Sequence, residues 1–281
     1  KKDLAPFLAD GLTYGAAVGA CLGKLYPHAS SLLKEPNNIL ALAYYQALQK
    51  LKKGPQAYPL TRQGSGYNDT ALGDSLPSAQ ALRKELLLKG ITPQAAQGFP
   101  PEVLAILPAM LAEKPLPAMD EPFYLLLKHT LSQMTPEAIV KASDCSEGLE
   151  NKFLAALKAT SYEDFLALIK SKRYPLARLK RLSCQLLLSS SQVSFGATRK
   201  MAPAYLRVLG FTDKGRQLLR QMKGTATLPL ITKLHRNELS HGSNAFKAEL
   251  ATDIAATNLY DLLNGNVHYN RDYLASPLYY K

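Results

Sequence analysis

The sequence predicts a mainly α-helical protein, in which a partial α/β portion is followed by a helical bundle. Two observations favour this class. Between Pro36 and Gly90 the chain reads as a helix, an extended segment, a glycine-bearing loop and a second helix, which is the order of an α/β unit. After Thr92, apolar residues recur at helical spacing behind proline-containing helix starts, and segments of strand character nearly disappear.

The first part of the chain is predicted to alternate helices with one strand. Residues 4–25 are rich in alanine and glycine and predict one or two helices, interrupted at 11–14. A further helix starts at Pro36 and is expected to run through a lysine-rich last turn to Gly54. Residues 57–62 predict a short strand that leads into the loop 63–69. The expected buried face of the Pro36 helix consists of Ile39, Leu40, Leu42, Ala43, Ala47 and Leu48.

The helix that starts after Ser78 is the first candidate binding feature. A serine at this position can accept a hydrogen bond from a free backbone N–H group of the first turn, and Gly90 ends the helix. A helix N-terminus attracts anions, and Arg83 adds a bidentate partner for phosphate on the face that it shares with Gln80. A capped surface helix with a solvated arginine is the commoner meaning of such a pattern. Asn37, Arg62, Ser78 and Arg83 together form a polar set suited to the ribose and phosphates of a nucleotide.

The remainder of the chain is predicted to be a bundle. Thr92-Pro93, Thr135-Pro136 and Tyr174-Pro175 are typical helix starts, with proline near the first helical position. Predicted helices cover residues 102–111, 122–132, 136–140, 147–159, 162–171 and 175–188. Thr212 opens another helix, residues 249–263 predict the last one, and residues 228–233 fit either a strand or the start of a helix.

Composition narrows the classes of function. With 34 Lys and Arg against 22 Asp and Glu the formal charge is +12, which favours a nucleic acid or another polyanion as partner, although a merely solvated basic surface is the alternative. No apolar run approaches the roughly 20 residues of a membrane span, so we expect no membrane association and a cytoplasmic location. Three cysteines without a Cys-x-x-Cys pair predict free thiols. Five scattered histidines give no metal-binding or hydrolase motif, and no catalytic residue is assigned.

The strongest local charge signal is the segment 170–181. Six of its twelve residues are Lys or Arg and none is acidic. On the helix after Pro175, four leucines (Leu176, Leu179, Leu182 and Leu186) are predicted to form a core stripe, while the opposite face presents cations to phosphate groups. Tyr174 is suited to stack on an unpaired base. The candidate RNA contacts of this segment are Lys170, Lys172, Arg173, Tyr174, Arg178, Lys180 and Arg181, and a second basic cluster adds Arg207, Lys214 and Arg216.

Several blocks of the sequence, in the family's order, resemble the bacterial tRNA(Met) cytidine acetate ligase family. The blocks are Pro36-Asn37-Asn38-Ile39-Leu40, Thr61-Arg62, Pro77-Ser78-Ala79-Gln80-Ala81-Leu82-Arg83-Lys84, Cys145-Ser146-Glu147-Gly148-Leu149-Glu150, the basic run 170–181, and Tyr205-Leu206-Arg207-Val208-Leu209-Gly210-Phe211 with Lys214-Gly215-Arg216. The resemblance extends over nearly the whole chain and rests on independent blocks.

The resemblance implies a fold, an activity and a set of contacts. Residues 1–92 would be the C-terminal part of a nucleotidyltransferase-like (Rossmann-like) α/β domain, and residues 93–281 a helical tRNA-binding domain. The family activates acetate with ATP, accompanied by Mg²⁺, to acetyl-adenylate and then acetylates N4 of the wobble cytidine in elongator tRNA(Met). By position, Asn37 and Arg62 would contact ATP, Ser78 and Arg83 would form the second phosphate-binding signature, and the basic run would hold tRNA.

The sequence departs from the family's pattern at three points. The family's glycine- and histidine-bearing HIGH-type ATP loop is not found, Gln80 stands where threonine is usual, and Asn68 stands where histidine is expected. We therefore expect this chain to carry half an active site and not to form acetyl-adenylate unaided. Two alternatives remain, namely a non-catalytic RNA-binding module or degenerate nucleotidyltransferase relative, and an adenylyltransferase for another small substrate.

Overall fold

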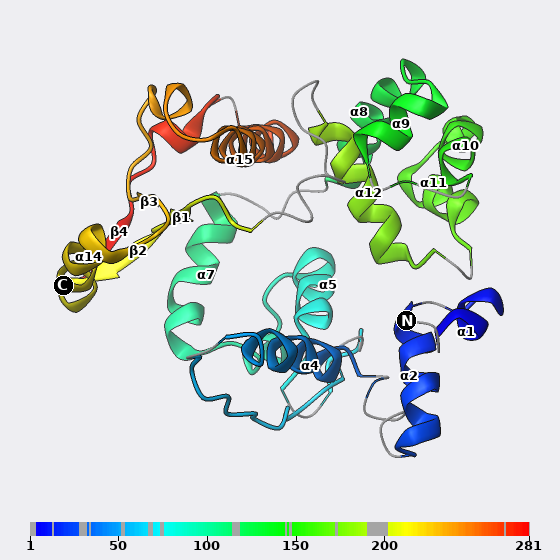
Figure 1. The fold of residues 1–281 in the computed structure, drawn as a ribbon, viewed down its shortest axis with the longest axis horizontal. Coiled ribbons are helices and arrows are strands. Elements are labelled where there is room, and N and C mark those ends of the chain that lie inside the picture. The colour runs from blue at the N-terminus through cyan, green and yellow to red at the C-terminus, as the bar shows by residue number, and fades with distance from the viewer. Residues whose placement is uncertain are drawn as a thin grey trace. The chain divides into compact units, whose positions relative to one another are not determined.

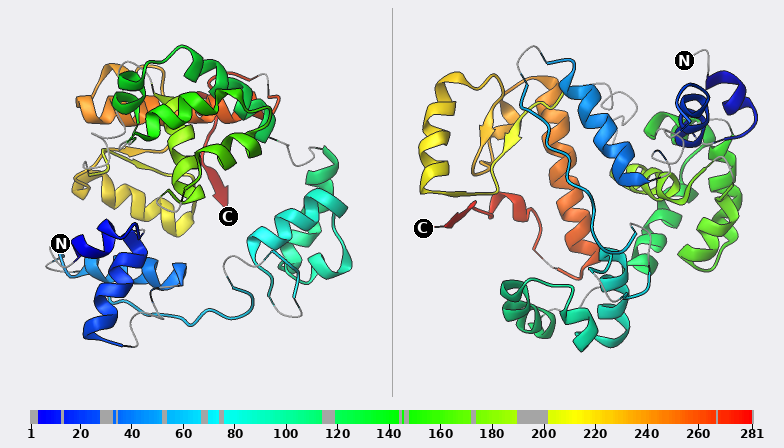
Figure 2. Two further views of the ribbon diagram at one scale, coloured as in Figure 1. Left: turned by 90° about the vertical axis from the view of Figure 1, so that its right-hand side faces the viewer. Right: turned by 90° about the horizontal axis from the view of Figure 1, so that it is seen from below.

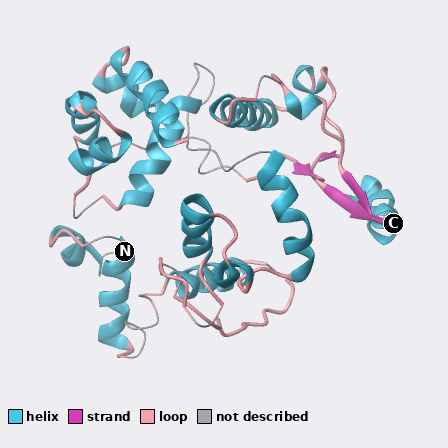
Figure 3. Ribbon diagram, turned by 180° about the vertical axis from the view of Figure 1, so that it is seen from behind, coloured by secondary structure: helices cyan, strands magenta, loops and turns pink. Residues whose placement is uncertain are grey.

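The structure is a computed structural model, and it describes residues 4–12, 14–27, 33, 35–51, 54–66, 70–73, 76–113, 119–143, 145, 148–171, 174–189, 202–266 and 268–280. Helices dominate the described chain, and its strands are few and short, so the mainly α class is confirmed (Figure 3). The chain divides into two compact units, Lys1–Pro117 and Ala118–Lys281. The boundary between the two predicted functional domains, at residues 92 and 93, is not tested by this division and stays a prediction.

The described part of the first unit consists of helices and the irregular segments between them (Figure 1). Its helices are α1 (Ala5–Ala9), α2 (Tyr14–Leu25), α4 (Pro36–Leu48), α5 (Ala79–Lys89), α6 (Pro93–Ala96) and α7 (Pro101–Glu113). The predicted interruption at 11–14 is confirmed, because Gly11 adopts a positive φ of 79° between α1 and α2. The predicted start of α6 is confirmed too, since the Thr92 hydroxyl accepts a hydrogen bond from the backbone N–H of Ala95 at 3.2 Å.

The predicted strand at residues 57–62 is wrong. This segment has no regular secondary structure, and the side chains of Tyr58 and Leu60 are 77% and 93% exposed. A strand needs a partner for its backbone groups, and the described part of the first unit contains no other strand with which it could pair. Pro59 also removes one backbone donor from the segment.

The helix predicted from Pro36 is confirmed, but its end and its buried face are not. It ends at Leu48 instead of near Gly54, and none of its residues is buried. Leu40, placed on the predicted core face, is 56% exposed. Helical spacing of apolar residues defines a face, whereas burial depends on whether another element covers that face.

The second unit begins with the predicted bundle. Its helices are α8 (Asp120–Ser132), α9 (Pro136–Ala142), α10 (Leu149–Ala155), the short 3₁₀ turn η2 (Ala156–Lys158), α11 (Tyr162–Ile169) and α12 (Leu176–Leu188). Its core holds fully buried leucines and aromatic rings, with the Phe165 ring centroid 5.3 Å from that of Tyr124 and 5.6 Å from that of Phe153. The Tyr124 hydroxyl donates to the carbonyl of Ala159 at 2.9 Å, so this buried polar group is satisfied.

After α12, the described part of the second unit combines two parallel strand pairs with two long helices. Its elements are β1 (Leu206–Arg207), β2 (Gly210–Thr212), α14 (Asp213–Thr225), β3 (Leu230–Ile231), η3 (Glu238–Ser240), α15 (Asn244–Leu263), η4 (Arg271–Tyr273) and β4 (Leu278–Tyr280). Strand β1 pairs with β3, and β2 pairs with β4. Parallel pairs need crossover connections, and α14 and α15 lie on these connections (Figure 2, right, yellow and orange).

A second hydrophobic cluster supports this arrangement. It is formed by Tyr205, Ile231, Leu234, Phe246, Leu250 and Ile254. Helix α15 starts five residues earlier than predicted, because the Ser243 hydroxyl accepts a hydrogen bond from the backbone N–H of Phe246 at 3.2 Å. Of the two readings for residues 228–233, the strand is observed.

Candidate nucleotide and nucleic-acid interfaces

The start of α5 is built as predicted. Ser78 has extended backbone angles (φ −70°, ψ 152°), and its Oγ accepts a hydrogen bond from the backbone N–H of Ala81 at 3.0 Å. The side chain is 1% exposed, so its hydroxyl serves the helix cap. The turn after α6 packs closely against this start. There is no room for a side chain at Gly98, where a Cβ would lie 2.6 Å from Cγ of Pro77. The first turn of α5 is therefore held in a fixed position.

A short loop connects Arg62 to the same place. The Arg62 Nε donates to the carbonyl of Ser65 at 3.0 Å, and the backbone N–H of Ser65 donates to the carbonyl of Leu76 at 3.0 Å. Gly64, just before Ser65, has a φ of 83°, and a Cβ at this position would lie 2.5 Å from the Leu76 carbonyl oxygen. Only glycine allows the backbone to come this close to Leu76. The loop is therefore held against the chain at Leu76, two residues before Ser78.

The structure brings together part of the predicted nucleotide set. Arg62 and Ser78 are linked through Leu76, and Arg83 is exposed one turn into α5. Asn37 is the second residue of α4 and is half-buried, and within the described residues no hydrogen bond or ion pair joins it to Arg62 or Arg83. Gln80 is exposed, and Asn68 lies outside the described residues.

Helix α12 separates its core face from its cations. Leu179, Leu182 and Leu186 are buried as predicted, whereas Leu176 is 40% exposed and does not complete the stripe. Lys180 and Arg181 are exposed and Arg178 is half-buried. Successive helical residues are rotated by about 100°, so Arg181 lies opposite the core while Arg178 and Lys180 lie on its two flanks.

The corner before α12 holds Tyr174 in the protein. Its side chain is 4% exposed, and the Arg178 guanidinium lies over its ring at 5.1 Å from the centroid. A base stacked on this face of the ring would displace Arg178. Lys170 is exposed at the end of α11, and Lys172 and Arg173 lie outside the described residues.

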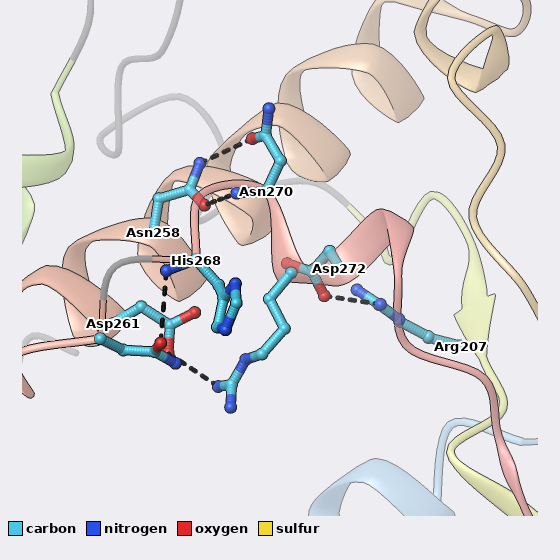
Figure 4. Close-up of polar contacts among 8 residues, drawn as sticks. Arg207, Asn258, Asp261, His268, Asn270 and Asp272 are labelled. Carbon is cyan, nitrogen blue, oxygen red and sulfur yellow. Dashed lines mark hydrogen bonds and ion pairs between the residues drawn. The ribbon is translucent and has the colours of Figure 1, made fainter.

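Arg207 is held by a buried carboxylate (Figure 4). Its Nη2 lies 2.6 Å from Oδ1 of Asp272, and the two side chains are 24% and 10% exposed. The ion pair connects β1 to η4 near the end of the chain. Arg207 is therefore fixed in orientation, with part of its donor capacity already used.

The helix α14 places Lys214 and Arg216 on different sides. Both are exposed, but residues two apart on a helix do not face each other. The Asp213 carboxylate accepts a hydrogen bond from the Tyr279 hydroxyl at 2.5 Å, and this bond is the main reason that the pKa of Tyr279 is raised. Arg216 is close enough to act in the opposite direction on the pKa of Tyr279.

Sequence reasoning missed the polar network around the end of α15. Arg271 Nη2 lies 3.0 Å from Oδ1 of Asp261, whose side chain is 2% exposed. The Asn258 and Asn270 side chains are joined at 2.9 Å, and Asn270 adopts a left-handed φ of 60° (Figure 4). These partners are far apart in sequence or lie in a polar tail, so no local pattern indicates them.

The described residues contain no group of three or more His, Cys, Asp or Glu placed to hold a metal ion. They also contain no helix with the length and apolar character that a bilayer crossing requires. The thiols of Cys21, Cys145 and Cys184 are not joined in a disulfide bond, as predicted.

Comparison with known proteins decides the family. A family model described as HIGH Nucleotidyl Transferase matches residues 1–273. The tRNA(Met) cytidine acetate ligase of Clostridium kluyveri is 32% identical over 287 residues, covering 99% of this chain and 68% of that protein. The chain belongs to the tRNA(Met) cytidine acetate ligase family. The family is one of enzymes, and its Clostridium perfringens member is 31% identical over 292 residues, covering 100% of this chain and 69% of that protein.

Solved structures of the tRNA(Met) cytidine acetate ligase family show the same fold. Thermotoga maritima TmcAL in its apo form matches with a TM-score of 0.86 at 25% identity, covering 99% of this chain and 70% of that one. The same protein bound with alpha-thio ATP matches with a TM-score of 0.81, covering 99% and 69%. The nucleotidyltransferase-like fold expected from the sequence is thereby confirmed.

Proposed function

We propose that this chain binds ATP and elongator tRNA(Met) as part of an acetate–tRNA ligase that forms N4-acetylcytidine at the wobble position. In the first step, an acetate oxygen attacks the α-phosphorus of ATP and pyrophosphate leaves, which gives acetyl-adenylate. In the second step, N4 of the cytidine attacks the acetyl carbonyl, AMP leaves, and the amine loses one proton. Positioning and charge stabilisation at the α-phosphate support the first step, so no covalent protein intermediate is needed.

The observation that carries the nucleotide part is the fixed start of α5. The first N–H groups of a helix have no acceptor within the helix, and its dipole favours an anion there. Ser78 and the Arg62 loop hold this start in place, and Arg83 lies exposed one turn further on. In this proposal Arg83 and Arg62 contact phosphates, Ser78 acts through the first turn, and Asn37 contacts the nucleotide from α4. Mg²⁺ would arrive with the ATP phosphates.

The tRNA part rests on the cations of the second unit. Lys170, Lys180 and Arg181 are exposed, and Arg178 is braced by the ring of Tyr174. Phosphate contacts of this kind give a strongly salt-dependent affinity. Arg207, Lys214 and Arg216 extend the proposed contact, together with Lys172 and Arg173.

One test measures the affinity for both ligands, ATP and tRNA, in two variants. Arg83→Ala is expected to weaken ATP binding about tenfold or more, because a bidentate charged contact is lost, and to leave tRNA affinity within about twofold. Arg181→Glu is expected to do the reverse and to flatten the salt dependence of tRNA binding. Both affinities are measured by titration with labelled ATP and with elongator tRNA(Met). Lys84→Ala, which removes the exposed cation next to Arg83, is the matched control.

Three outcomes would contradict the proposal. Equal effects of Arg83→Ala and Lys84→Ala on ATP binding would remove the α5 site. Unchanged tRNA affinity in Arg181→Glu would remove helix α12. The sequence contains no His-x-Gly-His motif, so the 281 residues alone are proposed not to catalyse acetate-dependent exchange of pyrophosphate into ATP, and such exchange would refute the half-site assignment.

A second candidate is a non-catalytic RNA-binding relative. Gln80 and Asn68, at positions where the family has other residues, favour it. This candidate predicts tRNA binding without any ATP binding, so the same titrations separate the two functions.

A further inference from the structure

The second unit contains a pocket for which the proposed function gives no role. It lies among α8, α11, α12 and α15 and has a volume of 340 Å³. This is at the lower end of the range of about 300–1,000 Å³ that is typical of small-molecule pockets, so it suits one compact group and not a helix or strand. Its walls are largely apolar, with Asp120, Lys180 and Cys184 as the polar exceptions besides the tyrosines.

Three aromatic rings from three helices line this pocket. Phe123 of α8 and Tyr162 of α11 have ring centroids 5.2 Å apart, and Tyr162 is 5% exposed and stacked near Phe165. These two rings therefore form a fixed wall. Tyr260 of α15 also lines the pocket but is 49% exposed, so its ring can adjust to a flat group that enters.

Opposite charges lie at the same pocket. Lys180 belongs to the cationic flank of α12, and Asp120 is the first residue of α8. A neighbouring hollow shares Lys180, Asp120 and Tyr162 and adds Lys170, so two lysines line it. An ammonium group suits a phosphate, while a carboxylate accepts a hydrogen bond from an exocyclic amino group, such as N4 of cytosine.

We infer that this pocket binds one unpaired, amino-bearing base of the tRNA anticodon loop, with the adjoining phosphate on Lys180. The base lies between the fixed wall of Phe123 and Tyr162 and the adjustable ring of Tyr260. The Asp120 carboxylate accepts a hydrogen bond from the amino group of the base. The inference rests on the proposed function, because it takes tRNA as the ligand. It adds a site that reads a base, whereas the cations of α12 contact only the backbone.

The test uses the full 281-residue chain and the anticodon stem–loop of elongator tRNA(Met), with a series in which each loop nucleotide in turn is abasic. Tyr260→Ala is expected to weaken binding about five- to a hundredfold, because a stacking partner is lost. One abasic position is expected to give a similar loss in the wild-type chain. On that RNA, Tyr260→Ala should cause little further loss, since the base that it would contact is already missing.

The controls separate the pocket from general effects. Leu262→Ala removes a side chain of α15 that is 62% exposed and does not line the pocket, and it should leave affinity unchanged. Tyr260→Phe should restore binding, and Asp120→Asn should reduce the preference for cytosine over uracil at the identified position. The inference would be overturned if Tyr260→Ala and Leu262→Ala bound the stem–loop with equal affinity. It would also be overturned if the loss from Tyr260→Ala multiplied with the loss from the missing base at every abasic position. A wild-type chain that binds no stem–loop would instead refute the proposed tRNA function.

Discussion

The first unit and the helical bundle of the second unit contain helices of similar length but differ in what they bury. In the described part of the first unit, the buried hydrophobic side chains are all alanines (Ala17, Ala81 and Ala95). The bundle buries Tyr124, Phe153 and Phe165 together with leucines from every one of its longer helices. Leu40 of α4 is 56% exposed, whereas Leu179 of α12 is fully buried.

This difference teaches that a helical pattern and a covered face are separate properties. Both helices carry apolar residues at helical spacing, but those of α4 spread around most of the helix, whereas those of α12 form one stripe, and only the stripe of α12 is covered by neighbours. Because burial of apolar area is the dominant favourable contribution to folding, the two regions should differ in stability even though both are helical.

The largest expected effect tests this difference directly. Phe165→Ala removes a fully buried ring in contact with three others and should destabilise the bundle by about 3–5 kcal/mol. Leu40→Ala, in α4, should change stability by less than about 0.5 kcal/mol. The change in unfolding free energy of each variant is measured by urea unfolding, with hydrogen exchange of peptides from each region as the probe. A cost of several kcal/mol for Leu40→Ala would show that the α4 face is covered after all.

A pair of glycines gives an intermediate effect in the first unit. Gly64→Ala forces a Cβ to within 2.5 Å of the Leu76 oxygen at a φ of 83°, so we expect a cost of about 1–3 kcal/mol and weaker ATP binding through displacement of Arg62. Gly15→Ala, in helix α2, meets no atom within 4 Å and should be neutral or slightly stabilising. Thermal unfolding and ATP titration measure both, and unchanged ATP affinity in Gly64→Ala would detach this loop from the nucleotide site.

The smallest effect appears only at high pH. Burial raises the pKa of Tyr162 to about 12, so the folded state holds this proton more tightly than the unfolded state does. The resulting stabilisation is complete below pH about 10 and is lost as the pH rises toward about 12. Tyr162→Phe should therefore lose less stability than the wild type between pH 9 and 11, as measured by urea midpoints. An equal loss in both proteins would place the alkaline sensitivity elsewhere, for example at Tyr205, whose pKa burial also raises.

Local chemistry made much of the fold predictable. Ser78, Thr92 and Thr135 each accept a hydrogen bond from the first turn of a helix, as their positions before the helices indicated. Three leucines of the predicted α12 stripe are buried because leucines at helical spacing beside cations define both faces, whereas Leu176 at the start of the helix is exposed. The strand expected at 57–62 failed, because a strand depends on a partner that local residues do not specify.

Long-range contacts account for what sequence could not give at the candidate sites. The burial of Tyr174 depends on the packing of the bundle around it, and the contact of Arg207 with Asp272 joins β1 to η4. Asp261 is a polar residue on an otherwise unremarkable stretch of α15, yet it is buried and holds Arg271. Only the folded chain shows which of these charges are free to meet a ligand and which are already engaged.

The parallel pairing of β2 with β4 also has a consequence for synthesis of the chain on the ribosome. Asp213, at the start of α14, bonds to Tyr279, which is 66 residues further along. Strand β2 can find its partner only after β4 has left the exit tunnel, so the base beneath α14 is completed only once residues 278–280 have been synthesised. A chain that stops before Leu278 would contain every residue of α14 but not the strand that completes its support.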